Sequence, residues 1–232
     1  MDKVIVSLLK RNQDQFAPVV PFNMDAENVV IFDFSQENKE MEQIDLFDVD
    51  SFSGYVFGKL NKAGAEFGIG RYGENRSIYK RSRHFNIPGK ESRTIHLGID
   101  IWAQENTPVS SPLDAKVHSL ANNTTFGDYG PTIIMEHTLE NIEFYTLYGH
   151  LSLNSVENIQ PGTFVKKGEK FAEFGNYEVN GNWPPHLHFQ IIKNMGDYKG
   201  DFPGVAPPSE KNAFFDLCPN PNLILQVNKL EN

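Results

Sequence analysis

Two strand-like runs joined by a short turn constrain the fold of this chain more than any other feature. Residues 131–137 (PTIIMEH) and 142–151 (IEFYTLYGHL) are rich in β-branched and aromatic residues, and ENIE at 140–143 is typical of a hairpin turn. Gly and Pro punctuate further short apolar runs on both sides of this hairpin. No helical periodicity is apparent over residues 94–192. This region is therefore predicted to be all-β and antiparallel.

Length and composition limit the class of protein. A chain of 232 residues with 39% hydrophobic residues can form one sizeable domain, or one domain with extensions, and is of the soluble globular type. The net charge of −9 argues against nucleic acid as a partner, because phosphate binding needs a basic surface. Most of the excess lies in residues 25–50, which hold nine acidic residues against Lys39. The lone cysteine, Cys218, excludes an intramolecular disulfide.

No segment of the sequence predicts membrane insertion. No run approaches the ~20 apolar residues that a spanning helix needs. The apolar run VIVSLL near the start is interrupted by Ser7 and followed by charges, without a small-residue cleavage site. We therefore expect a cytoplasmic protein, with a processed or exported form as the alternative.

Changes in composition along the sequence predict that the chain has three parts. Residues 1–55 mix apolar runs with the acidic segment and are expected to be an acidic, irregular N-terminal extension. Residues 56–195 are expected to form the β domain. Residues 196–232 are expected to be a C-terminal extension packing on it, with AFFDLCPNPNLIL at 213–225 as a last short helix ended by prolines.

Paired histidines provide the first chemical signal. In NWPPHLHFQII, residues 182–192, alternation along a strand places His186 and His188 on one face. Upstream, HLGID places His96 and Asp100 on either side of Gly98, which permits a close backbone approach or an unusual φ. A histidine bonded to its own aspartate is the structural alternative for that pair.

These residues together match the chemistry of a catalytic zinc site. Such a site takes three protein ligands, from imidazole and carboxylate groups among others, and keeps one position open for water. His96, Asp100 and one histidine of HLH would supply the three. The other histidine of HLH and His150, in YGHLS, would remain to move protons or hold an oxyanion. For His84, His118 and His137, no partner residue lies at a spacing that would indicate a metal or catalytic site. We expect these three to be surface histidines or hydrogen-bonded core histidines.

The combined motif resembles the LytM/lysostaphin-type zinc metallopeptidases. Their pattern is H-x-x-x-D, a distant G-H and then H-x-H, which are HLGID, YGH and HLH here, over about residues 56–193. The resemblance implies the family's antiparallel β-sheet sandwich, with a groove over the sheet, and a bound Zn²⁺. It further implies zinc ligands and a catalytic pair, the ligands being His96, Asp100 and His188, and the pair His150 and His186.

A finer likeness extends over most of residues 56–226. HLGIDIWAQENTPVSSPLDAKVHS, NGNWPPHLHFQI and GDFPGVAPPSE look like a peptidase-like module in large fusion proteins, where it lies between a kinase-like phosphotransferase domain and a class-III aminotransferase domain. Cell-wall relatives carry a small Ser/Thr/Gly-rich loop before H-x-H, whereas this chain has bulky Trp183 there. Arg76, in GENRSIY, resembles an upstream family motif that supports the groove. Arg76 and Trp183 are thus candidate substrate-binding residues.

The resemblance implies a zinc-dependent metalloendopeptidase that hydrolyses a peptide amide. A cell-wall muropeptide and another intracellular peptide are both open as the substrate. The alternative is a non-catalytic, zinc-containing binding or scaffold module with the same fold. A structural zinc protein is a third class, but it would need four protein ligands. The division of acid–base and oxyanion roles between His150 and His186 stays open.

Overall fold

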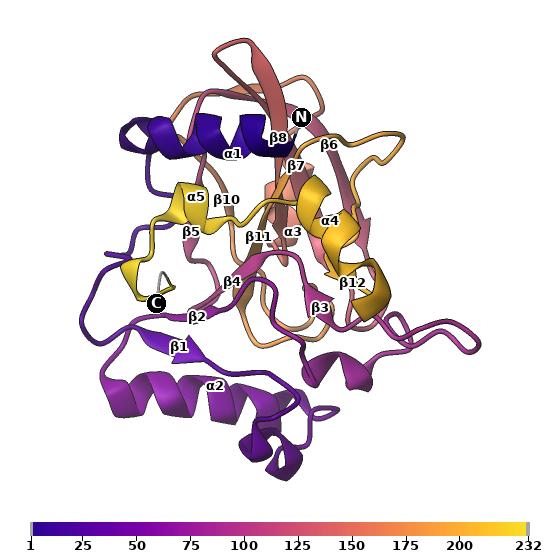
Figure 1. Cartoon of the computed structure of the whole chain (residues 1–232). Helices are drawn as coiled ribbons and strands as arrows, with labels where there is room; N and C mark the ends of the chain where they lie inside the picture. Colours follow the sequence, from indigo (N-terminus) through magenta and orange to yellow (C-terminus); the bar gives the residue numbers. More distant parts are fainter. Residues whose placement is uncertain (1, 231–232) are drawn as a thin grey trace.

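One large, mainly antiparallel sheet dominates the computed structural model, which describes residues 2–230 (Figure 1). Its strand order is β1-β2-β4-β11-β8-β7-β6-β9, and every neighbouring pair is antiparallel except β1–β2. The strands are β1 (Val30–Phe32), β2 (Gly68–Gly70), β4 (Ile99–Trp102), β6 (Ala115–Asn123), β7 (Gly130–Leu139), β8 (Ile142–Gly149), β9 (Phe164–Val165) and β11 (His186–Ile192). The predicted mainly β, antiparallel fold is confirmed.

A second layer covers one face of this sheet. The two-stranded sheet of β5 (Pro108–Ser110) and β10 (Lys170–Glu173) supplies Val109 and Ala172 to the same buried cluster as Leu187 and Phe189 of β11. Because side chains alternate along β11, His186 and His188 lie on the opposite face. A further small sheet, of β3 (Ile95–His96) and β12 (Val205–Ala206), lies beside that second face.

The hairpin predicted at ENIE is present between β7 and β8. Leu139 pairs with Ile142, so the loop has only two residues, Glu140 and Asn141. Both have positive φ, 49° and 62°, which is the backbone of a tight hairpin turn that matches strand twist. The strand-rich flanks and the turn residue Asn therefore predicted this element correctly.

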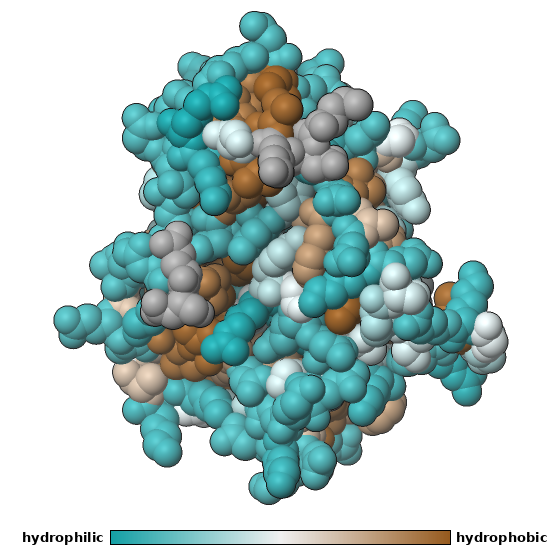
Figure 2. Space-filling model, in the orientation of Figure 1, coloured by the Kyte–Doolittle hydropathy of each residue, from teal (hydrophilic) through white to brown (hydrophobic). Residues whose placement is uncertain are grey.

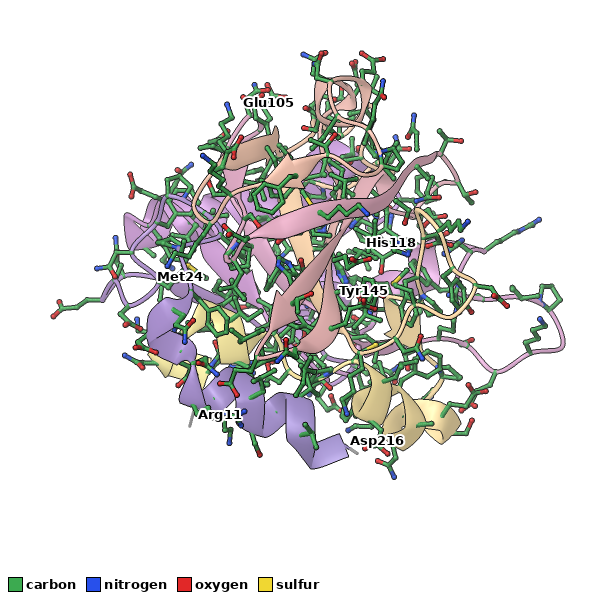
Figure 3. The ribbon with its side chains drawn as sticks, turned by 90° about the horizontal axis from the view of Figure 1, so that it is seen from above. Arg11, Met24, Glu105, His118, Tyr145 and Asp216 are labelled. Carbon is green, nitrogen blue, oxygen red and sulfur yellow. The ribbon has the colours of Figure 1, made fainter. Side chains whose placement is uncertain are left out.

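Helices occupy the periphery. α1 (Asp2–Arg11) buries Leu8 and Leu9 in the same core cluster as residues of β5 and β10. It ends at Arg11, labelled in Figure 3, whose side chain pairs with Glu140. α2 (Val49–Ala63) lies at the other end of the molecule (Figure 1). The remaining helices are short: η1 (Gln13–Gln15), η2 (Lys39–Gln43), η3 (Ile78–Arg81), α3 (Leu153–Glu157), η4 (Pro208–Glu210), α4 (Lys211–Leu217), α5 (Asn222–Leu225) and η5 (Asn228–Leu230). α3 interrupts the region expected to be all-β, because five residues capped by Ser152 are too few to show a helical period.

The N-terminal extension is more regular than the sequence suggested. It contributes β1, the one parallel strand of the large sheet, and it contains α1 and the first half of α2. α2 runs through the expected boundary at residue 55, from its cap at Asp48 to Gly64 in the left-handed conformation. The domain boundaries themselves stay predictions.

The surface is largely hydrophilic on the face shown in Figure 2, with separate apolar areas. Among the helices of residues 2–230, none combines the length and the apolar composition that crossing a membrane requires.

Candidate metal centre and catalytic site

The three central strands of the large sheet bring the predicted site residues together. β11 lies between β4 and β8, and its register places His188 opposite both Asp100 and Gly149. His186 lies opposite Trp102 in the same ladder. His150 directly follows β8, and His96 belongs to β3. All five predicted metal and catalytic residues are buried on one side of the sheet.

Three ligand atoms converge at short distances. The Nε2 atom of His96 lies 3.0 Å from the Nδ1 atom of His188. Each of these nitrogens lies 3.2 Å from Asp100 Oδ1. Within residues 2–230, this trio is the group of histidine and acidic side chains that could hold a metal ion.

The outer hydrogen bonds of the two imidazoles decide which nitrogens carry hydrogen. His96 Nδ1 lies 2.8 Å from the carbonyl oxygen of Arg71, and a carbonyl can only accept, so Nδ1 is the donor. His188 Nε2 lies 2.9 Å from Gln190 Oε1 and is likewise the donor, because the Gln190 amide nitrogen donates to Pro203 O at 3.1 Å. Burial lowers the pKa of His96 to about 3, so this ring is neutral at pH 7. In these tautomers His96 Nε2 and His188 Nδ1 both present lone pairs.

Two imidazole lone pairs and a carboxylate oxygen therefore face one another without a hydrogen between them. This arrangement is repulsive unless a cation lies between the three atoms. A tetrahedral zinc site with bonds of 2.0–2.1 Å separates its ligands by about 3.3 Å, close to the separations of 3.0 and 3.2 Å found here. The donor set of His96, Asp100 and His188 fits Zn²⁺.

Arg76 holds the carboxylate ligand from behind. Its guanidinium donates to Asp100 Oδ2 and, at 2.9 Å, to Glu74, which leaves Asp100 Oδ1 for the metal. Burial opposes ionisation of Asp100, but His96 and the Arg76 charge hold its pKa well below the usual range. The Arg76 side chain is 1% exposed. It borders the site cavity and also donates to the Tyr79 hydroxyl and the Arg71 carbonyl, and the substrate contact expected for it stays a prediction.

His150 and His186 present equivalent nitrogens. The Nδ1 atoms of both rings donate at 2.8 Å to backbone carbonyls, those of Asn180 and Pro184 respectively. Their Nε2 atoms therefore carry lone pairs, and the ring centroids lie 4.1 Å apart. Burial lowers the pKa of His186 to about 4 and that of His150 well below its ordinary value. Both imidazoles are neutral and able to accept a proton.

The backbone of His150 is strained and firmly held. Its φ of 63° lies in the left-handed region, which is unfavourable for a residue with a side chain. Its N–H donates to Tyr129 O at 2.8 Å, and its carbonyl accepts from Gly175 N at 2.8 Å. Together with the Asn180 contact, these bonds fix the ring toward the site.

Gly98 gives the metal ligand its space. A Cβ at this position would lie 2.5 Å from His188 Cε1, far inside contact distance. Of the two reasons expected for this glycine, close approach is the one observed, since Gly98 is not among the residues with positive φ.

A cavity of 260 Å³ opens beside the trio. Asp100, His150, His186 and His188 contribute to its wall, as do the aromatic rings of Tyr79, Tyr129, Trp102 and Trp183. Three converging protein ligands, two of which (Asp100 and His188) border a cavity, match the open-position arrangement of a catalytic zinc site. Trp183 is 3% exposed, and its indole N–H has no hydrogen-bond partner in the described part of the chain, so its expected contact with substrate also stays a prediction.

Sequence reasoning missed several supporting residues. Gln190 fixes the His188 tautomer, and its position two residues along the same strand face could have indicated it. Trp102 stacks on His186 with ring centroids 3.9 Å apart, and Glu74 binds Arg76. Glu74 lies in the GENRSIY motif, two residues before Arg76, and Trp102 lies two residues after the end of HLGID, but nothing in the sequence assigned either residue a supporting role. Of the histidines read as ordinary, His84 lines the cavity, whereas His137 is buried and bonds Thr146.

Comparison with known proteins agrees with this geometry. Residues 94–199 match the family described as Peptidase family M23. An uncharacterized metalloprotease of Haemophilus influenzae is 30% identical over 135 residues, which cover 58% of this chain and 26% of the relative. These two findings support peptidase family M23, and with it a metallopeptidase-type domain, for the matched part of the chain.

Solved structures of peptidases are also similar. A zinc-containing peptidase from Vibrio cholerae is 31% identical, with 42% of this chain and 27% of that chain covered and a TM-score of 0.34. The catalytic domain of lysostaphin from Staphylococcus simulans is 22% identical, with 50% and 77% covered and a TM-score of 0.37. The chain spans about a quarter of the length of the Haemophilus and Vibrio proteins. The likeness to a module of kinase–aminotransferase fusion proteins stays a prediction.

Proposed function

We propose that this chain is a zinc-dependent metallopeptidase that hydrolyses a peptide amide. The observation that carries the proposal is the convergence of three lone pairs, from His96, Asp100 and His188, beside a cavity that Asp100 and His188 line. The match to peptidase family M23 supports it. The non-catalytic alternative is not favoured, because two neutral imidazoles with free Nε2 atoms border the same cavity.

Each site residue has a role in the proposed hydrolysis that follows from its position. Bound zinc supplies Lewis-acid chemistry, which acidifies water and polarises a substrate carbonyl. One of His150 and His186 would take the proton of the attacking water at Nε2 and return it to the leaving amine, a contribution of ~10²–10⁴-fold for such groups. The other would lie beside the developing oxyanion, and the division of these two roles between them stays open. Arg76 and Gln190 hold Asp100 and His188 in place through the bonds described above.

The substrate is proposed to be a peptide, with peptidoglycan-derived peptides as one class and intracellular peptides as the other. Aromatic rings form much of the cavity wall. Because such a wall excludes water, the cavity suits a peptide whose scissile amide is bound with little water around it. The cytoplasmic location expected from the sequence remains part of this proposal, and it favours the intracellular class.

Metal content and turnover of two variants test the proposal. His188→Ala removes a ligand and should abolish stoichiometric zinc in native mass spectrometry. His186→Ala should retain zinc and lose turnover of a peptide library that includes pentaglycine and muropeptides. His118→Ala, in a half-buried histidine of β6, is the matched control and should change neither. Equal zinc loss in the His186 and His188 variants would contradict the assigned roles.

A further inference from the structure

The site cavity has a second, charged wall that the proposed reaction does not use. His84, Arg93, Asp128 and Asp201 line the same cavity as two of the metal ligands, Asp100 and His188, and the catalytic pair. They come from the segment that follows η3, from the loop before β7 and from the loop before β12. Four ionisable groups in the lining of one cavity indicate a role in recognising charge.

The Asp128 carboxylate is positioned by two contacts, but no cationic side chain forms an ion pair with it in the described part of the chain. One carboxylate oxygen accepts from the backbone N–H of Tyr129 at 2.8 Å, and the other lies 3.6 Å from His84 Nδ1. The side chain is 12% exposed, and burial raises the pKa of this carboxyl above its ordinary value. A cation in the cavity would relieve this cost.

Asp201 has no partner at all in the described residues. Within residues 2–230 its carboxylate makes no hydrogen bond and no ion pair, although it lies in the cavity wall and in the field of His84 and Asp128. Carboxylates that line a cavity and lack a protein partner are available to a ligand.

The positive groups nearby do not neutralise both carboxylates. Arg93 donates to the backbone carbonyl of His84 and stacks over the ring of Phe85 at 5.2 Å, and in the described part of the chain it forms no ion pair with either aspartate. Burial lowers the pKa of His84, so its imidazole is uncharged at pH 7. Two carboxylates and one guanidinium leave this wall with a net negative charge.

Tyr129 links the negative wall to the metal ligands. Its backbone N–H binds Asp128, and its hydroxyl lies 3.5 Å from His188 Nε2. Gly204 allows this, because a Cβ there would lie 1.8 Å from the hydroxyl oxygen. Asp128 is thus connected through Tyr129 to a ligand that would hold a dication.

We propose that Asp128 and Asp201 form a subsite for an ammonium group of the peptide substrate, carried close to the scissile amide. The inference rests on the proposed peptidase function and specifies its substrate class. The ammonium can be the free N-terminus of the peptide or the side chain of a lysine-like residue, because both present the same charge and donors. In either case the carboxylates fix the register of the substrate against the metal.

A surface groove adjoins the cavity that holds this subsite. This groove of 670 Å³ shares Phe85, Arg93 and Tyr198 with the cavity wall and continues past Ile87 toward α4. The segment that carries Ile87 projects from the body of the molecule at the right of Figure 1. A peptide whose ammonium reaches Asp128 and Asp201 can therefore continue into this groove.

Matched peptides and isosteric variants test the subsite on the zinc-loaded chain. The peptides are a lysine-containing sequence, the same sequence with norleucine, and each with a free or acetylated N-terminus. For wild type we expect KM to be at least 10-fold lower for the peptide bearing the required ammonium, with kcat little changed. Asp201→Asn and Asp128→Asn should remove that preference by raising KM for cationic peptides alone. Glu105→Gln, the same charge change at an exposed site far from α4 (Figure 3), should leave it intact.

The readouts separate this inference from the proposed activity. Calorimetric binding of the same peptides reports the subsite even if no bond is cleaved, and zinc content confirms that each variant is folded. Loss of preference on acetylation identifies the N-terminus, and loss with norleucine identifies the side chain. Equal binding and hydrolysis of all four peptides by wild type would overturn the subsite while leaving the peptidase proposal standing. Binding that depends on Asp201 without any hydrolysis would support the subsite and contradict the peptidase proposal.

Discussion

Gly98, which lies between β3 and β4, leaves room for the metal ligand His188 because it has no side chain. In Gly98→Ala the new methyl group would lie 2.5 Å from His188 Cε1, so the ring must move. We expect zinc affinity to fall about 10–100-fold, the range typical of a disturbed ligand support. A competition titration with a chromogenic chelator measures this.

Gly54→Ala is the control for that substitution. Gly54 lies in α2 with nothing within 4 Å of a new Cβ, so alanine should leave zinc affinity unchanged and slightly favour the helix. Equal zinc affinity in Gly98→Ala and wild type would show that the ring has room to shift.

His137 couples stability to pH away from the metal site. Burial lowers the pKa of His137 from 6.5 to about 4. Between these two pH values the imidazole is protonated in the unfolded chain but stays neutral in the folded chain. Stability from this group is therefore complete above pH 6.5 and is lost as pH falls toward 4, by about 3 kcal/mol at most. Urea unfolding of wild type and His137→Gln at pH 7 and 5 should show a smaller loss in the variant.

His118→Gln serves as the comparison, because His118 is half-buried on the same sheet and lies beside Tyr145 (Figure 3). Its pH dependence should follow that of wild type. If His137→Gln also retained the full wild-type loss between pH 7 and 5, other groups would account for the acid sensitivity.

At the scale of elements, α2 tests whether the N-terminal segment belongs to the folding unit. Phe52 of α2 is fully buried and packs against Trp102 and Trp183, with ring centroids 5.8 and 6.2 Å away. Phe52→Ala should lower the free energy of unfolding by about 3–5 kcal/mol, the usual cost of removing a buried phenylalanine. Urea denaturation measures this.

Phe47 provides the matched substitution, since it precedes α2 and is 69% exposed. Phe47→Ala should change stability by no more than about 0.5 kcal/mol. A cost of Phe52→Ala as small as that of Phe47→Ala would mean that α2 is an appendage, as the sequence suggested for residues 1–55.

Elements that depend on local signals were predictable, and those that depend on partners were not. The β7–β8 hairpin follows from β-branched residues around a turn, and the His186–His188 pair follows from strand alternation. β1 has only three residues, and its parallel pairing with β2 is decided by packing across the chain. The support that Arg76 gives to Asp100 likewise depends on tertiary contact, which is why only its location near the groove could be anticipated.

At the scale of the whole molecule, zinc should contribute to stability because the unfolded chain lacks the assembled site. At free zinc 1,000 times the dissociation constant, linkage gives about 4 kcal/mol. For a domain of this size that corresponds to a Tm about 8–16 °C higher than after chelation. Differential scanning fluorimetry with and without a chelator checks this.

The His188→Ala variant should show no such difference in Tm, since one ligand of the trio is gone. A wild-type Tm that does not change on chelation would contradict the assignment of a zinc site to the folded chain.

The pairing of His188 with Asp100 across β4 and β11 has a consequence for how the chain matures. A slip of one residue between these strands would bring Leu187 opposite Asp100 and turn both imidazoles of β11 to the far side. The ion could not be captured by such a mispaired sheet. Only molecules with the native register between β4 and β11 would therefore bind the metal. Metal binding would distinguish correctly folded new chains from mispaired ones before any substrate is bound.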